Sequence, residues 1–273
     1  MQRALAEDLG RGDLTTAAVV PDGAAARARV EQRAPGVIFG LDAAAEVFRQ
    51  TGGGELEFRA AAEEGVWRDR GEVLSVEGPA AAVLAGERVA LNLLGRLSGV
   101  ATLTARYVAA VEDTGTRILD TRKTTPGLRE LEKAAVVAGG GVSHRAGLYD
   151  AILVKENHAL LAGGVGEAAR LALANRGEAA FVEVEVESLA ELDEVLEAGV
   201  DRVLLDDMSL DDMREGTRRA HDASATTEAS GGVSLEAARE VAQTGVDYIS
   251  VGALTHSAPA LDLSLLLEPD PQR

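Results

Sequence analysis

Cationic side chains gather at three places in the sequence, where a bound anion would neutralise them. They are Arg122-Lys123, His144-Arg145 and Lys155. Each alone would make an ordinary surface ion pair, but together they favour a ligand that carries two anionic groups. A planar guanidinium holds a carboxylate through two parallel hydrogen bonds, whereas an ammonium suits a phosphate. The sequence therefore predicts a site for a carboxylate beside a phosphate or diphosphate.

Two carboxylates and two glycine-containing loops add to these candidate groups. Glu185 and Asp206 each end an apolar run, and they could share a metal ion or bind sugar hydroxyls. Ser230-Gly231-Gly232 precedes a predicted helix, where backbone N–H groups and the helix dipole favour an anion. A lone Ser-Gly-Gly is more often a simple turn. Together with Gly252-Ala253, however, it occupies the last two loops of a repeating pattern, where barrels often build a phosphate site.

The composition narrows the functional classes. Of the 273 residues, 46% are hydrophobic and 26% are charged, which is typical of a globular chain of one or two domains. The net charge of −18 disfavours nucleic acid and membrane surfaces as partners. The sequence has no cysteine, so disulfides, thiolate metal sites and cysteine nucleophiles are excluded. With no apolar signal segment near its start, the chain is expected in the cytoplasm.

The elements that must position these groups follow a repeating pattern. From about Thr116 onward, short β-branched runs alternate with amphipathic stretches, as in successive strand and helix units. Ser188, Ser209 and Ser234 stand where helix N-caps belong. The pattern predicts a parallel α/β barrel, with an open doubly wound sheet as the competing fold. The predicted strands cover residues 117–120, 151–154, 181–186, 202–205, 226–229 and 248–251, with 141–145 as a candidate seventh.

Upstream of these units the pattern is that of an α+β domain. Short strand-like runs are separated there by turns that contain glycine and proline. Two consecutive helices, over residues 80–97 and 100–111, then lead into the repeating units. We place the domain boundary near Leu97. This predicts an N-terminal α/β domain over residues 1–97 and a barrel domain over residues 98–259.

At these residues the sequence resembles the quinolinate phosphoribosyltransferases, also called nicotinate-nucleotide pyrophosphorylases (carboxylating). The resemblance covers nearly the whole chain in order and is far more specific than any single motif. The matching stretches are residues 7–10, 12–16, 87–94, 97–102, 120–129, 139–145, 153–158, 183–186, 228–232 and 251–256.

The resemblance implies an enzyme that transfers the phosphoribosyl group of 5-phosphoribosyl 1-diphosphate to quinolinate, with Mg²⁺ as cofactor. The products are nicotinate mononucleotide, diphosphate and CO₂, a step of de novo NAD synthesis. It also implies an open α/β sandwich followed by a seven-stranded α/β barrel, with residues 260–273 returning to the sandwich. Family members form homodimers in which each active site borrows residues from the partner subunit.

The resemblance also implies roles for individual residues. Lys155, Glu185 and Asp206 take catalytic roles, with Glu185 and Asp206 engaging the ribose hydroxyls and Mg²⁺. Arg88 resembles the arginine that reaches the quinolinate of the neighbouring subunit, and Lys123 resembles a diphosphate ligand. The implied quinolinate ligands are Arg122, His144 and Arg145, and the implied 5-phosphate site consists of Ser230, Gly231, Gly232, Gly252 and Ala253. Thr121 and Val251 are further implied substrate-binding residues.

Two residues depart from the family pattern, and three other functions compete with it. Asp207 stands where we expect asparagine, and Arg96 is a cation without an assigned role.

The nearest alternative function is that of a related phosphoribosyltransferase of the type associated with molybdenum transport, which uses another acceptor. A Schiff-base aldolase barrel with Lys155 as nucleophile is the second alternative, and a sugar-phosphate sensor without catalysis is the third.

Overall fold

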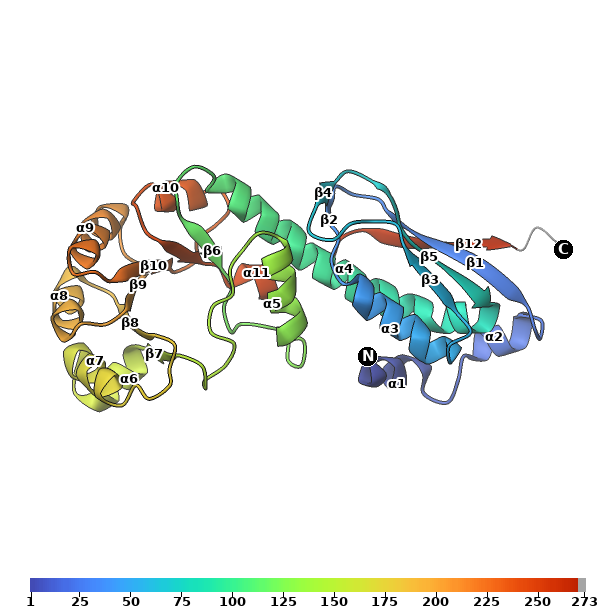
Figure 1. Ribbon diagram of the computed structural model, residues 1–273, viewed down its shortest axis with the longest axis horizontal. Helices are drawn as coiled ribbons and strands as arrows, with labels where there is room; N and C mark the ends of the chain where they lie inside the picture. Colours follow the sequence, from blue (N-terminus) through green and yellow to red (C-terminus); the bar gives the residue numbers. More distant parts are fainter. Residues whose placement is uncertain (270–273) are drawn as a thin grey trace. The chain divides into compact units, whose positions relative to one another are not determined.

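A computed structural model describes residues 1–269 of the chain, which divides into two compact units (Figure 1). The first unit contains Met1–Ala105, Ala138–Gly140 and the chain from Ala258 onward. The second contains Arg106–Val137 and Gly141–Ser257. No helix within the described residues is long and apolar enough to cross a lipid bilayer.

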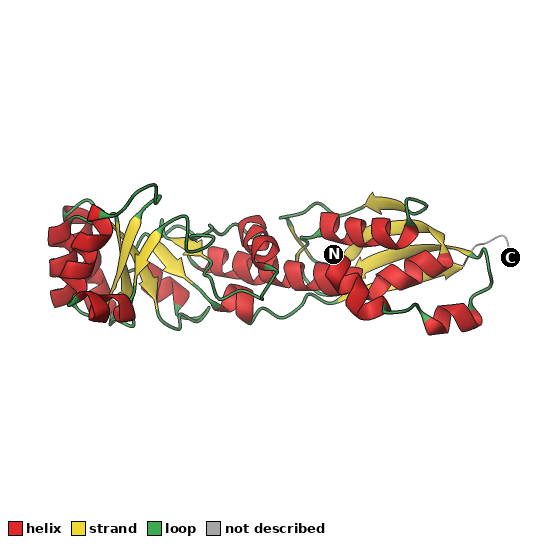
Figure 2. Cartoon of the chain, turned by 90° about the horizontal axis from the view of Figure 1, so that it is seen from below, coloured by secondary structure: helices red, strands yellow, loops and turns green. Residues whose placement is uncertain are grey.

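The first unit is built on a four-stranded antiparallel sheet with the strand order β12-β1-β5-β3. Alternate residues of β1, such as Ala28 and Val30, point into the core. Figures 1 and 2 show α3 and the first part of α4 covering one face of this sheet. The elements are α1 (Gln2–Leu9), α2 (Leu14–Val19), β1 (Ala25–Gln32), β2 (Gly36–Val37), α3 (Leu41–Gly52), β3 (Glu57–Ala60), β4 (Trp67–Arg68), β5 (Gly71–Pro79), α4 (Ala80–Ala110) and β12 (Leu263–Pro269).

Strand β12 comes from the far end of the chain and pairs with β1, with Leu265 opposite Val30. The sequence predicts a return of residues 260–273 to this domain. Of that segment, residues 270–273 lie outside the described part of the chain.

The prediction of two helices around residue 97 is wrong, because α4 runs unbroken from Ala80 to Ala110. Gly99, which lies between the two predicted helices, continues the helix and allows close packing. A Cβ on Gly99 would lie 2.1 Å from the carbonyl oxygen of Pro259, so only glycine fits there. Arg96 secures the same segment, since its Nη1 donates to the carbonyl oxygen of Ala258 at 3.0 Å.

The second unit holds a six-stranded parallel sheet with the order β6-β11-β10-β9-β8-β7. Figure 2 shows its strands in yellow with red helices packed outside them. The candidate seventh strand is reduced to one bridge between Val142 and Leu119, so the barrel is incomplete. The elements are β6 (Arg117–Leu119), α5 (Arg129–Ala138), β7 (Ile152–Val154), α6 (Glu156–Ala162), α7 (Val165–Ala174), β8 (Val182–Val186), α8 (Leu189–Ala198), β9 (Arg202–Asp206), α9 (Leu210–Asp222), β10 (Thr226–Ser230), α10 (Ala238–Ala242), β11 (Tyr248–Ser250) and α11 (Ala253–His256).

Two of the three predicted helix caps are confirmed. The Ser188 hydroxyl accepts from the N–H of Glu191 at the start of α8, and Ser209 caps α9 in the same way. Ser234 accepts from the N–H of Ala237, but α10 begins only at Ala238, so this serine stabilises the preceding turn. These caps fix where the chain leaves each strand and enters the next helix.

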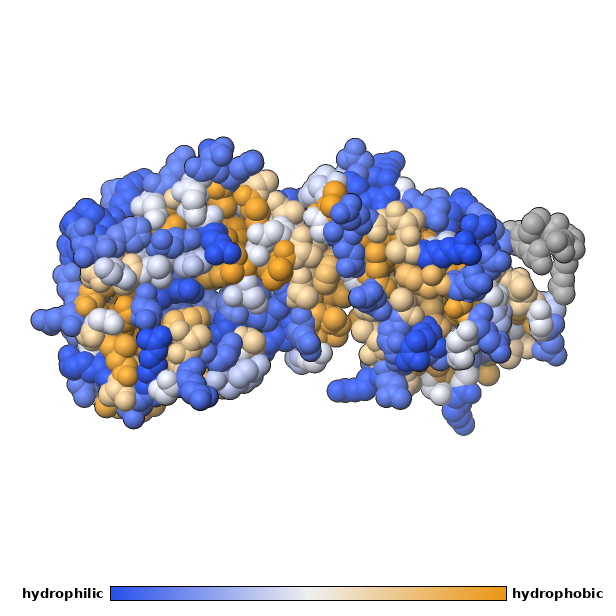
Figure 3. All heavy atoms as spheres, viewed as in Figure 1, coloured by the Kyte–Doolittle hydropathy of each residue, from blue (hydrophilic) through white to orange (hydrophobic). Residues whose placement is uncertain are grey.

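Large apolar side chains are exposed on the second unit, two of them on α6 and two in the segment before β7. Leu148, Tyr149, Leu160 and Leu161 are between 72% and 89% exposed, although such residues are usually buried. Figure 3 shows apolar surface, coloured orange, among the polar side chains in the region that α6 and α7 occupy in Figure 1. A surface of this kind is typical of an interface with another protein.

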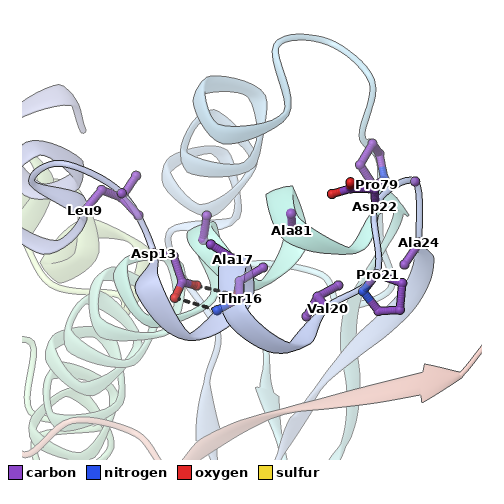
Figure 4. A pocket seen from close by; sticks show the side chains of 13 residues that line it. Leu9, Asp13, Thr16, Ala17, Val20, Pro21, Asp22, Ala24, Pro79 and Ala81 are labelled. Carbon is purple, nitrogen blue, oxygen red and sulfur yellow. Dashed lines mark hydrogen bonds between the residues drawn. The ribbon is translucent and has the colours of Figure 1, made fainter.

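The N-terminal motif of residues 12–16 has a local structural role in the first unit. Asp13 caps α2, since its Oδ1 accepts from the N–H groups of Thr15 and Thr16 at 3.0 Å (Figure 4). The same segment lines a shallow cavity of about 420 Å³ whose other walls include Val20 and Pro79. The cavity walls are mostly apolar, and the carboxylate of Asp13 is occupied by its cap.

Candidate active site

The predicted site residues of the second unit lie where its parallel strands end. Thr121 to Lys123 follow β6, Lys155 follows β7, and Glu185 lies near the end of β8. Asp206 and Ser230 are the last residues of β9 and β10, which pair side by side. The carboxyl ends of parallel strands share one edge of a sheet, the usual position of active sites in α/β barrels.

A cavity of about 310 Å³ opens among these residues. The predicted residues that line it are Thr121, Arg122, Lys123, His144, Arg145, Lys155 and Ser230. It is also lined by Leu153, Leu204, Glu228 and Ser250, to which the sequence analysis gave no role. Cations and a histidine thus surround a space large enough for a small anionic molecule.

Two guanidinium groups of this cavity have no carboxylate partner among residues 1–269. Arg145 donates from Nη1 to the carbonyl oxygen of Ala151 at 3.3 Å, and Nε of Arg122 is buried without a hydrogen-bond partner. Burial and the nearby charge of Arg122 lower the pKa of Arg145. A bound dicarboxylate would satisfy the free donors and relieve this repulsion.

His144 is held from several sides. Its Nε2 lies 2.9 Å from Oε2 of Glu183 and 3.2 Å from Oε2 of Glu228, while the N–H of Arg145 donates to Nδ1 at 2.6 Å. Burial alone would lower the pKa of His144, but the two carboxylates outweigh it and raise that pKa. Burial and the charge of Glu228 raise the pKa of Glu183. A proton is therefore retained between Nε2 and these carboxylates.

The backbone N–H of His144 is anchored as well. It donates to Oδ1 of Asp120 at 2.8 Å, and Oδ1 also accepts from the ammonium of Lys133. The hydroxyl of Ser143 donates to the second oxygen, Oδ2, at 3.2 Å. Asp120 and Lys133 are almost fully buried, so this pair fixes the start of the segment that carries His144 and Arg145.

Lys155 and the predicted metal ligands form a second group. The ammonium of Lys155 contacts the carboxylate of Glu185, which is nearly buried, while Lys155 itself is about half exposed. Burial raises the pKa of Glu185, and the charge of Asp206 acts in the same direction. Two oxygen-donor side chains whose charges repel each other fit a hard divalent cation such as Mg²⁺.

The two glycine loops lie at the ends of β10 and β11. Gly231 and Gly232 have φ values of +104° and +56°, a region that favours glycine. A Cβ on Gly252 would lie 3.0 Å from Cδ of Lys123, so the predicted phosphate loop and the predicted diphosphate ligand are adjacent. Val251 is buried, and its N–H donates to the carbonyl oxygen of Leu119. Ala253 begins α11.

Asp207, the residue that departs from the family pattern, adopts a left-handed backbone conformation with φ of +49°. Aspartate and asparagine tolerate this conformation better than most residues. Its side chain leaves no room for a side chain on Gly231, since Oδ1 would lie 2.1 Å from a Cβ there. The carboxylate of Asp207 therefore packs against the predicted phosphate loop.

Arg88 is the one predicted site residue that belongs to the first unit. It lies on α4, its side chain is exposed, and it forms no ion pair within residues 1–269.

Glu183 and Glu228 are buried carboxylates beside the site to which the sequence assigned no role. Glu183 alternates with Glu185 in the run Val182–Val186, a pattern that places both on one face of β8.

The comparisons with known proteins agree with this geometry. Models of the N-terminal and C-terminal domains of quinolinate phosphoribosyl transferase match residues 13–98 and 100–266. A nicotinate-nucleotide pyrophosphorylase [carboxylating] of Mycobacterium leprae is 43% identical over 97% of this chain and 95% of its own. A probable enzyme of the same name from Bacillus subtilis is 42% identical over 95% of this chain and 89% of its own.

A solved structure supports the same relationship. The crystal structure of NadC from Streptococcus pyogenes superposes with a TM-score of 0.92 at 38% identity, covering 98% of this chain and 95% of its own. Both domain models, the curated relatives and this neighbour cover nearly the full length described here. The chain belongs to the quinolinate phosphoribosyltransferase family.

Proposed function

We propose that the chain joins quinolinate to 5-phosphoribosyl 1-diphosphate and releases CO₂ and diphosphate, with nicotinate mononucleotide as the product. Its relatives are named for this carboxylating or decarboxylating phosphoribosyl transfer. One structural observation carries the acceptor assignment. Arg122 and Arg145 line one cavity, Nε of Arg122 has no hydrogen-bond partner, and neither guanidinium forms an ion pair within residues 1–269. A pyridine dicarboxylate supplies the two anionic groups that this arrangement lacks.

The first chemical step breaks the bond between the ribose carbon and the diphosphate. Charge develops on the departing oxygen and, with opposite sign, on the ribose. Lys123 would stabilise the diphosphate, and the glycine loops around Gly231 and Gly252 would hold the distal phosphate. Lys155 lies between the acceptor cations and Glu185, where it would keep both anionic substrates in place. The ring nitrogen of quinolinate then forms the new bond to the ribose carbon.

The second step removes one carboxylate from the ribosylated ring. The bond from the ring to that carboxylate breaks, CO₂ leaves, and the electron pair stays on the ring carbon beside the positive nitrogen. A proton then adds to this carbon. The cationic nitrogen stabilises the electron pair, so the step requires no nucleophile from the protein.

Glu185 and Asp206 are the residues that would hold Mg²⁺. The repulsion between their charges and the burial of Glu185 support this assignment. When bound, the ion would neutralise negative charge on the donor's diphosphate. Lys155 would then balance the remaining charge of Glu185.

We expect the purified protein to release diphosphate and CO₂ in equal amounts when it is given Mg²⁺, quinolinate and 5-phosphoribosyl 1-diphosphate. Diphosphate is measured by a coupled assay and CO₂ from carboxyl-labelled quinolinate. Chelation by EDTA should stop both releases, and added Mg²⁺ should restore them. Turnover with nicotinate but not with quinolinate would contradict the carboxylating assignment. It would favour a related transferase with another acceptor.

We also propose a homodimer in which Arg88 completes the acceptor site of the partner subunit. Arg88 is an exposed cation without an ion pair among the described residues. The exposed apolar side chains of the second unit, Leu148, Tyr149, Leu160 and Leu161, are a suitable surface for a second copy. Covering them would remove apolar area from water.

Complementation tests this arrangement. Arg88→Ala and Lys155→Ala proteins should each be inactive, because each lacks a cation of the same site. After subunit exchange, a mixed dimer would contain one intact site, so equal mixing should restore up to about a quarter of the wild-type activity. Exchange is verified with two affinity tags. Mixed dimers without activity would show that Arg88 does not act in the partner's site.

A further inference from the structure

Charged side chains occupy the interior of the second unit's sheet, where apolar residues are usual. Glu183 of β8 and Glu228 of β10 are 0% and 1% exposed, and Arg202 begins β9, the strand between them. Burying a carboxylate costs free energy unless cations or hydrogen-bond donors compensate it. In addition, Oε1 of Glu183 has no hydrogen-bond partner among the described residues. Stability alone therefore does not explain these charges.

The two carboxylates converge on one atom of the candidate site. Oε2 of Glu183 and Oε2 of Glu228 lie 2.9 Å and 3.2 Å from Nε2 of His144. The ring of Phe181 meets the imidazole edge-on, with centroids 5.7 Å apart. The backbone N–H of Arg145 contacts the opposite ring nitrogen at 2.6 Å. The ring is thus hydrogen-bonded at both nitrogens, with Glu228 as a further anionic neighbour.

Arg202 provides the opposite charge from the amino end of the strands. Its Nη1 lies 3.8 Å from Oε2 of Glu228. Its guanidinium carbon is 4.5 Å from the ring centroid of Phe181 and 4.3 Å from that of Tyr248, so the group is stacked between two aromatic rings. Arg202 is absent from the lining of the 310 Å³ cavity, whereas His144 and Glu228 line it. Its effect on a ligand in this cavity would therefore be indirect, through neighbours such as Glu228 and His144.

We propose that Glu183, Glu228 and Arg202 are positioning residues that hold His144 and the adjoining Arg145 in the geometry that binds the acceptor. The inference rests on the proposed function, and it concerns only the part of the site that would bind the acceptor. Lys123 and the glycine loops, which would bind the donor, form no hydrogen bond or ion pair with the network among the described residues, although Lys123 and Glu228 line the same cavity. Loss of the network should therefore weaken binding of the acceptor and leave binding of the donor nearly unchanged.

A metal ion is the other way to bring these carboxylates together. Ligand atoms of His144, Glu183 and Glu228 lie within 4.8 Å of one another. However, Arg202 already supplies a positive charge beside Glu228, and a proton is shared at Nε2. Because Nδ1 accepts from the N–H of Arg145, the proton at Nε2 occupies the lone pair that a metal ion would need.

The test is Arg202→Met, which removes the charge and approximates the length of the side chain. We expect KM for quinolinate to rise about tenfold, with KM for the donor changed by less than about twofold. The Kd of quinolinate, measured by calorimetry without the donor, should rise with KM. Arg202→Lys keeps the charge and should recover part of the affinity. Arg176→Met is the matched control, because it breaks the ion pair with Asp201 and touches no residue of the network.

A second variant keeps the test decisive if Arg202→Met does not fold. Adding Glu228→Gln to Arg202→Met removes the carboxylate that loses its partner, so this double variant should fold more stably. Its Kd for quinolinate should still exceed the wild-type value about fivefold, since Nε2 keeps only one anionic partner. Unchanged quinolinate affinity in both variants, or equal effects on acceptor and donor, would overturn the proposal.

Two further results have distinct meanings. Stoichiometric metal in the purified protein, lost in Glu228→Gln together with quinolinate affinity, would replace the charge network with a metal site. A wild-type protein that binds quinolinate but does not turn it over would contradict the proposed function alone. In that case the calorimetric comparison of variants still decides the positioning roles of Arg202 and Glu228.

Discussion

Replacing Lys155 with alanine should lower kcat/KM for quinolinate by at least about 10³-fold, equivalent to about 4 kcal/mol of transition-state stabilisation. Lys155 lines the cavity beside the acceptor cations and contacts Glu185. It joins the predicted acceptor site to the predicted metal ligand Glu185. Its removal takes a positive charge from between two anionic substrates and leaves Glu185 without its partner.

The loss of activity should be catalytic and should persist in fully folded protein. The side chain of Glu185 is only 5% exposed, so removing Lys155 should also lower the free energy of unfolding. Guanidinium unfolding of Lys155→Ala identifies the conditions in which the variant is folded, and kcat/KM is compared there. Lys155→Arg keeps the charge but changes its shape, and we expect it to recover only part of the activity. Wild-type kcat/KM in Lys155→Ala would contradict the role assigned here.

The same lysine distinguishes the transferase from a Schiff-base aldolase. Borohydride reduction in the presence of carbonyl substrates should leave Lys155 unlabelled. The family match and the contact with the Glu185 carboxylate, which suits an ammonium, both favour this result. A reduced adduct on Lys155 would contradict the transferase assignment and favour a Schiff-base aldolase.

The sequence predicted the fold class because its periodic patterns are local. Alternating runs and serine caps such as Ser188 and Ser209 depend on a few neighbouring residues, and the structure confirms both caps. The predicted helix break near Leu97 is wrong. Gly99 continues the helix and packs closely against a distant residue, Pro259. Local sequence does not reveal that a glycine serves close packing instead of a turn.

The site was predictable in part for the same reason. The strand-end positions of Lys155, Glu185 and Asp206 follow from the barrel pattern, and the structure places them at the predicted edge. Glu183 lies within a stretch that matches the family, but the resemblance assigns it no role, although its spacing from Glu185 puts both on one face. Its partners His144 and Glu228 lie on other segments, and only the folded chain brings them together.

Lys133, the third lysine of the chain, has a structural role that its sequence context did not indicate. Lys133 and Asp120 form a buried ion pair, with side chains 7% and 0% exposed. Lys133→Met should lower the free energy of unfolding by about 3–5 kcal/mol, because it leaves the Asp120 carboxylate buried without a cation. Guanidinium unfolding followed by circular dichroism measures the loss. Arg170→Met, which breaks an exposed pair with Glu167, should cost less than about 1 kcal/mol.

The charge of Asp120 explains how this deficit should respond to pH and to a second substitution. Burial already raises the pKa of Asp120, although Lys133 and the hydrogen bonds from His144 and Ser143 act to lower it. Without Lys133, the folded protein would bind a proton at Asp120 more tightly than the unfolded chain does. The stability lost in Lys133→Met should therefore shrink as the pH falls below neutral. Adding Asp120→Asn should recover part of the loss at neutral pH, and a deficit unchanged by either treatment would contradict the buried charge as its cause.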